Sequence, residues 1–248
     1  MNSVILITFD SLRLDVAKAA LPDIPWETRT SWASWTLPSH LMLAAGLLPY
    51  RDHSGLAIEH YREQYAAWSR RFGVEVKREP EMWLPTTLRR LGIRCGAVTA
   101  MPCLNTVSPF SRQWRQHITS EEMDNTEEAL NIAASIINDG HPWFWMLNLG
   151  CTHYPFGLDL PHLSGMHGDQ GGVVDFDAGD YFQMGTAQSD RLAAAWPHVE
   201  RLIAGLPKGT TVIVTSDHGE LLGEDGLFGH GPFLHEVLYK VPYWEVTT

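Results

Sequence analysis

Polar residues that can bind a metal or attack an ester lie at the ends of apolar runs or at a helix start. They are Asp10 after residues 4–9, Thr36 before a helix opening at Pro38, His153 after residues 142–149, and Asp217 with His218 after residues 211–215. If the runs are parallel strands, their carboxyl ends meet at one sheet edge, where ligands bind in open α/β folds. Carboxylate, hydroxyl and imidazole groups gathered there suit Zn²⁺ or Mn²⁺, and a hydroxyl bound to such a metal becomes a usable nucleophile.

Each of these residues also has an ordinary structural explanation. A Thr before such a helix is a cap far more often than a nucleophile, and Asp is common in turns at strand ends. Taken singly, the structural explanations are favoured. Together they do not account for the order of four segments along the chain: FDSLRLD, TLPSHLMLAAGLLP, THYPF and SDHGELLGEDGLFGHGP.

The elements that must position these residues alternate between short apolar runs and amphipathic stretches. We expect strands over 4–9, 93–99, 142–149 and 211–215, and helices over 39–45, 84–91, 125–138 and 187–206. Asn125 is a candidate cap, and Pro197 should kink or split the last helix. Residues 162–179, rich in Gly, Asp and His, predict a mobile lid or a substrate-facing insertion. The alternation predicts an α/β fold with a mostly parallel central sheet and helices on both faces.

Composition narrows the class of protein. The 248 residues are 44% hydrophobic, which predicts a single domain over 1–248. A net charge of -11 and the absence of a basic run argue against a nucleic-acid partner. Since no apolar stretch reaches membrane-spanning length and residues 1–10 lack signal-peptide features, we expect a cytoplasmic protein without a membrane partner. Cys95, Cys103 and Cys151 lack metal-type spacing, which favours buried thiols.

In order and spacing, the four segments resemble the sulfatase-like branch of the alkaline phosphatase superfamily. The run Thr36-Leu37-Pro38-Ser39-His40 is similar to the C/S-x-P-x-R pattern of its nucleophile, and Gly46 matches the trailing Gly. SDHGE is similar to its metal-binding motif. The resemblance extends from the first strand to Val241-Pro242 and implies the family's α/β fold in a minimal form, without a full C-terminal subdomain.

The resemblance also implies a role for each matched residue. Thr36 would be the nucleophile, and the metal ligands would be Asp10, Thr36, Asp217 and His218. His153 corresponds to a His near the leaving group. His230 stands where the family keeps a Lys or His against the transferred group. These two imidazoles are the expected proton donors and, together with His40, the expected substrate-binding groups.

Three departures from the family pattern bear on the chemistry. Thr36 cannot become the formylglycine of true sulfatases, which favours attack on phosphorus. His40 replaces an Arg, so that a permanent bidentate donor is missing and more charge stabilisation falls on the metal. The family's Lys-x-His is absent, with residues 99–102 in its place, and Ser11 stands where many relatives have a second acid.

We therefore predict a metal-dependent hydrolase of phosphoric esters that acts through a covalent phospho-Thr36 intermediate. Phosphatase, phosphodiesterase and phosphonate monoester hydrolase activities all fit a small-molecule phosphate or phosphonate ester substrate. One Zn²⁺ or Mn²⁺ is favoured, although His153 and His230 could hold a second ion. The alternatives are a phosphotransferase that passes the group from Thr36 to an alcohol, a sulfatase-like hydrolase, and an inactive binding module.

Overall fold

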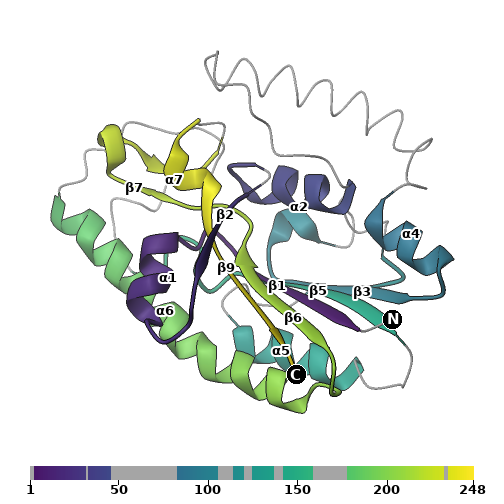
Figure 1. Cartoon of the computed structure of the whole chain (residues 1–248). Coiled ribbons are helices and arrows are strands. Elements are labelled where there is room, and N and C mark those ends of the chain that lie inside the picture. The colour runs from purple at the N-terminus through teal and green to yellow at the C-terminus, as the bar shows by residue number, and fades with distance from the viewer. Residues whose placement is uncertain are drawn as a thin grey trace, which may run out of the picture.

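A seven-stranded sheet forms the centre of the protein. The computed structural model describes residues 3–31, 33–45, 83–105, 114–119, 125–136, 142–158, 178–231 and 234–248. The strands are β1 (Val4–Phe9), β2 (Glu27–Thr30), β3 (Arg94–Thr99), β4 (Gln116–Thr119), β5 (Trp143–Leu149), β6 (Thr211–Ser216) and β9 (Lys240–Thr247). Their order in the sheet is β2-β9-β6-β1-β5-β3-β4 (Figure 1). The β6–β1–β5–β3–β4 pairs are parallel, whereas β9 pairs antiparallel with both β6 and β2.

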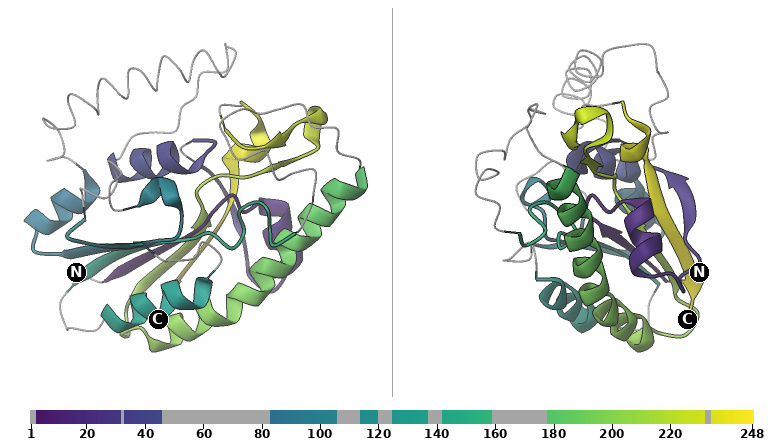
Figure 2. Two further views of the ribbon diagram at one scale, coloured as in Figure 1. Left: turned by 180° about the vertical axis from the view of Figure 1, so that it is seen from behind. Right: turned by 90° about the vertical axis from the view of Figure 1, so that its left-hand side faces the viewer.

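Helices cover both faces of this sheet. One layer consists of α1 (Leu14–Ala20), α5 (Thr126–Ile136) and α6 (Ala178–Gly205), and the other of α2 (Thr36–Ala45) and α4 (Leu84–Arg90). Figure 2 shows the layering from behind, with α2 and α4 above the sheet and α5 and α6 below it. The predicted α/β fold, mostly parallel with helices on both faces, is confirmed.

Smaller elements lie at the edge of the sheet that carries the strand ends. They are the 3-10 turn Pro102–Leu104, the short helix α7 (Glu236–Tyr239), and a hairpin of β7 (Leu221–Leu222) and β8 (Phe228–Gly229). No helix among the described residues has both the length and the apolar composition needed to cross a membrane.

The register of the central strands aligns their carboxyl ends. Phe9, the last residue of β1, pairs with Leu149 of β5 on one side and with Ser216 of β6 on the other. All of β5 is buried, and so is β1 from Ile5 onward. This buried and mostly apolar centre fixes the register, and the polar residues that follow the three strands come together at one level.

Most of the predicted strands and helices form where the sequence predicts them. All four predicted strands and the first three predicted helices form, and the side chain of Asn125 caps α5 by accepting a bond from the Glu128 N–H (3.0 Å). Pro197 does not split the last helix, which runs unbroken from Ala178. Its apolar face packs on the sheet, and this burial outweighs one lost backbone hydrogen bond.

Two further expectations need correction or fall outside the structure. Cys95 and Cys151 are buried, but Cys103 is exposed because it lies in the 3-10 turn at the sheet edge. Most of the predicted lid, residues 162–177, lies outside the described residues, and its last two residues belong to α6.

Candidate active site

Two carboxylates lie side by side where β1 and β6 end. Asp10 is fully buried and Asp217 is 3% exposed. The backbone N–H of Asp10 donates to Leu149 O (2.8 Å), which continues the β1–β5 pairing by one residue. The Asp217 Oδ1 atom accepts bonds from the N–H groups of Ser11 (3.1 Å) and His218 (3.0 Å). The carboxylate of Asp217 is therefore held in a fixed orientation.

Asp10, Asp217 and His218 form a group with the geometry of a metal site. Each offers a ligand atom within 4.8 Å of the others. His218 Nε2 lies 3.8 Å from Asp10 Oδ1 and 3.6 Å from Asp217 Oδ2. That Oδ2 atom is buried and has no hydrogen-bond partner among the described residues. A buried carboxylate oxygen without a partner is costly, and a bound divalent cation would satisfy it. The residues thus fit a divalent metal ion, whose identity the donor set leaves open.

The imidazole of His218 has the protonation that a metal ligand needs. Its Nδ1–H donates to the carbonyl oxygen of Gly219 (2.8 Å), so that the Nε2 lone pair points toward the two carboxylates. Burial, together with the charge of the His230 ring nearby, lowers the pKa of His218 to about 3. The ring is neutral at physiological pH and available as a nitrogen ligand.

The two carboxyl groups are electrostatically unequal. Burial raises the pKa of Asp10, but the surrounding imidazoles, led by His153 and His218, outweigh burial and bring this pKa below its ordinary value. Burial and the charge of Asp10 hold the pKa of Asp217 well above its ordinary value. Of the two carboxyl groups, Asp217 is therefore the one that takes up a proton more readily, and a bound metal would displace that proton.

Thr36 brings its hydroxyl to the same point from the first residue of α2. Its Oγ1 donates to Asp10 Oδ2 (3.1 Å) and lies 3.3 Å from His218 Nε2. The helix start is held there because the Ser39 hydroxyl donates to Asp217 O (2.6 Å). The structure brings Thr36 together with all three of the other expected metal ligands.

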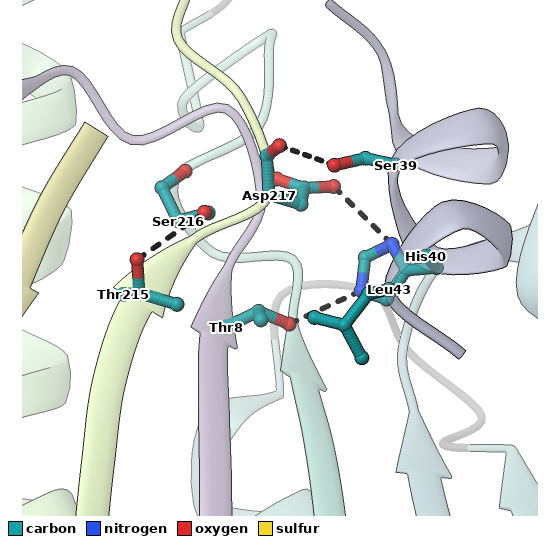
Figure 3. A pocket seen from close by; sticks show the side chains of 7 residues that line it. All are labelled: Thr8, Ser39, His40, Leu43, Thr215, Ser216 and Asp217. Atoms are coloured by element: carbon teal, nitrogen blue, oxygen red, sulfur yellow. Dashed lines mark hydrogen bonds and ion pairs between the residues drawn. The ribbon is translucent and has the colours of Figure 1, made fainter. Parts of the chain in front are cut away.

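His40 lies beside Asp217 among the residues that line the pocket drawn in Figure 3. Its Nδ1–H donates to the backbone oxygen of Thr36 (2.8 Å) and lies 3.6 Å from Asp217 Oδ2. Its Nε2 is 3.2 Å from the Thr8 hydroxyl. Burial lowers the pKa of His40, so the ring is neutral. Through its bond to the backbone oxygen of Thr36, the His40 ring helps to hold the expected nucleophile in place. Its expected contact with a substrate stays a prediction.

The remaining two imidazoles gather in front of His218. The His230 ring centroid lies 4.5 Å from that of His218 and 5.1 Å from that of His153. His153 Nδ1 donates to Tyr154 O (2.6 Å), and His230 Nδ1 donates to the buried carboxylate of Glu220 (3.0 Å). Both rings are therefore held in a fixed orientation through Nδ1.

Sequence reasoning missed two side chains that shape the site. Asn148 is fully buried, and its Nδ2 donates to Asp10 Oδ2 (3.4 Å). Glu220 lies inside the SDHGE segment, but its partner His230 could be identified only from the structure. A polar residue in the otherwise apolar strand end 143–149 was the one available signal for Asn148.

Comparison with solved structures shows the same fold in several proteins. The C-terminal periplasmic domain of phosphoethanolamine transferase EptC from Campylobacter jejuni has a TM-score of 0.61 at 12% identity, over 98% of this chain and 79% of that one. The corresponding EptC domain from Escherichia coli in complex with Zn has a TM-score of 0.55 at 14% identity, over 100% and 73%. BT1596, a 2-O GAG sulfatase, has a TM-score of 0.62 at 12% identity, over 100% and 64%. The sequence matches no family model and no curated protein.

These comparisons correct one expectation. A cytoplasmic location is contradicted, because both EptC neighbours are periplasmic domains. The expectation rested on the lack of an apolar stretch of membrane-spanning length and on the composition of residues 1–10, of which residues 4–9 form β1 in the structure. The motif resemblance itself is confirmed by the fold, since transferases and a sulfatase are both found among the neighbours. The chain has the fold of the sulfatase-like branch of the alkaline phosphatase superfamily.

Proposed function

We propose that this protein is a metal-dependent enzyme that moves a phosphoryl-type group through a covalent intermediate on Thr36, and that the final acceptor is an alcohol. One observation carries the proposal: the Thr36 hydroxyl lies 3.1 Å from Asp10 and 3.3 Å from His218, inside the cluster that fits a divalent cation. A residue that served only as a helix cap would not need to meet this cluster.

Asp10, Asp217 and His218 would hold the cation, with the Thr36 oxygen completing the set. A bound cation would lower the pKa of the Thr36 hydroxyl and polarise a phosphoryl oxygen. The orphaned Asp217 Oδ2 and the neutral His218 ring are the features of this chain that support such a site.

The residues of the chain divide the reaction into two displacements. The Thr36 hydroxyl gives up its proton to solvent, and Oγ1 attacks phosphorus in line with the leaving oxygen. His153 or His230, both held at Nδ1, protonates the leaving alcohol through Nε2. In the second displacement the same imidazole takes the proton of the acceptor alcohol, whose oxygen displaces the phosphoryl group from Thr36.

Transfer is favoured over hydrolysis by the comparison with the phosphoethanolamine transferase EptC. Hydrolysis, which the sequence motifs predict, differs only in the second displacement, where water replaces the alcohol. The likeness to a 2-O GAG sulfatase adds no third function, because Thr36 cannot be converted to formylglycine.

The test follows both products of a model diester. Zinc-loaded protein is incubated with bis(p-nitrophenyl) phosphate and increasing glycerol, and the phosphorus products are resolved by ³¹P NMR. We expect a glyceryl ester whose share rises with glycerol, and a mass increase on Thr36 in quenched samples. Thr36→Ala should abolish both, whereas the matched control Thr186→Ala, at an exposed helix position, should abolish neither.

Two results would contradict the proposal in different ways. If only p-nitrophenyl phosphate forms at every glycerol concentration, the enzyme is a hydrolase. If Thr36→Ala leaves nitrophenol release unchanged, Thr36 is not the nucleophile.

A further inference from the structure

A buried glutamine on α6 links two of the turns that carry site residues. Gln188 is fully buried. Its Nε2 donates to the backbone oxygens of Ser11 (3.1 Å) and Thr152 (2.9 Å), and its Oε1 accepts from the Arg13 N–H (3.4 Å). Ser11 and Arg13 belong to the turn after β1, and Thr152 to the turn after β5. One amide group therefore ties together the two turns that hold Asp10 and His153.

The turn after β1 needs such support because Ser11 has a left-handed backbone, with φ of 55°. This conformation is unfavourable for a residue with a side chain. It nevertheless aims the Ser11 N–H at Asp217 Oδ1 (3.1 Å). If the turn relaxed, that bond would be lost, and the Asp217 carboxylate could rotate.

The turn after β5 is tied to the same point by two hydroxyl groups. The Thr152 hydroxyl donates to Asp10 O (2.8 Å), and the Ser11 hydroxyl donates to Thr152 O (3.2 Å). Thr152 O thus accepts from both Ser11 and Gln188. These bonds form a closed network, and Gln188 is the member that anchors it to the helix layer.

We propose that Gln188 is a positioning residue for the metal site, acting through Ser11 on the orientation of Asp217 and through Thr152 on the backbone of Asp10. A buried amide with three backbone partners contributes little apolar packing of its own. Its bonds instead fix the two carboxylates at the separation that a cation requires. The proposal rests on the metal site of the proposed function.

The expected effect is a loss of metal affinity greater than any loss of fold. Partners that orient metal ligands without touching the metal typically change affinity by about 10- to 100-fold when mutated. Gln188→Met keeps the length and volume of the side chain and removes all three bonds. Gln188→Glu keeps the shape but replaces the Nε2 amide group with an oxygen, which carries at most one proton for the two carbonyl oxygens that it faces.

Zinc affinity is measured by isothermal titration of metal-stripped protein, and folding by circular dichroism of the same samples. We expect both Gln188 variants to bind zinc about 10- to 100-fold more weakly than wild type. The matched control Gln183→Met, at an exposed position of the same helix, should bind zinc as wild type does. If Gln188→Met does not fold, Gln188→Glu decides the comparison.

The outcomes separate this inference from the proposed function. Unchanged zinc affinity in a folded Gln188 variant, even with a lower melting temperature, overturns the positioning role and leaves the metal site standing. A wild-type protein that binds no zinc overturns both.

Discussion

Zinc should raise the melting temperature of the wild-type protein, and Asp217→Asn should abolish the rise. A ligand that binds only the folded state at about 100 times its Kd stabilises that state by about 2.7 kcal/mol. For a chain of about 150–250 residues, 1 kcal/mol corresponds to about 2–4 °C, so the expected rise is about 5–11 °C. The assay is thermal unfolding by circular dichroism, with metal-stripped protein and increasing zinc.

The structure indicates why Asp217→Asn is a clean perturbation. The Asn side-chain oxygen can accept the same bonds from the N–H groups of Ser11 and His218, whereas its NH₂ group replaces the Oδ2 atom that would bind the metal. Because burial and the charge of Asp10 raise the pKa of Asp217, a neutral side chain such as Asn is favoured at this position when no metal is bound. The metal-free variant should therefore melt at or above the wild-type temperature.

The exposed Asp190 on α6 provides the control, since Asp190→Asn removes an equal charge away from the cluster. Its zinc-dependent rise should equal that of wild type. The reasoning is refuted if zinc stabilises Asp217→Asn as much as wild type, or if wild type shows no rise.

The other predictions concern catalysis and packing. Thr36→Ala should lose orders of magnitude in turnover while staying folded, and Thr36→Ser should keep part of the turnover. If Thr36 only capped the helix, the Ala variant would lose about 0.5–2 kcal/mol of stability and keep its turnover per folded molecule. If His153 or His230 is the general acid, its replacement by Ala should slow the cleavage of alkyl esters far more than the cleavage of nitrophenyl esters. Equal losses of rate on both substrates in both variants would mean that neither residue is the acid. Gly96→Ala should lower the free energy of unfolding by about 1–3 kcal/mol in urea titrations, because the new Cβ would lie 2.3 Å from the Trp145 ring; an unchanged midpoint would contradict this packing.

The sequence was most informative where burial dictates residue type. The run at Thr211–Ser216 is β-branched, and the run at Trp143–Leu149 is buried on both faces, so that both strands could be identified directly. The metal cluster could be predicted for the same reason: parallel strands in register bring the residues that follow them to one edge.

The sequence was least informative where structure depends on distant partners. The strand Glu27–Thr30 is exposed throughout and has no apolar alternation, and it forms only because it pairs with the antiparallel strand Lys240–Thr247. No local signal predicts that pairing. Gln188 was equally hidden, because a polar residue in a helix ordinarily faces solvent, and only the packing of α6 against both site turns reveals its partners.

Ser11 departs from the family pattern by turning inward. Where many relatives have a second acid, its hydroxyl donates to Thr152 O and its N–H to Asp217. The residue therefore orients one carboxylate of the cluster and does not add another.

His40, in the place of the family's Arg, shows a related change with a chemical consequence. Its Nδ1 proton is committed to the backbone oxygen of Thr36, and burial lowers its pKa, so that the neutral ring cannot supply the permanent positive charge of a guanidinium. In the proposed reaction, negative charge on the transferred phosphoryl group would then be balanced by the cation and by the imidazoles of His153 and His230, whose rings lie 5.1 Å apart beside the cluster. The replacement of Arg would thus shift charge stabilisation to the cation and to the two imidazoles that are the proposed proton donors.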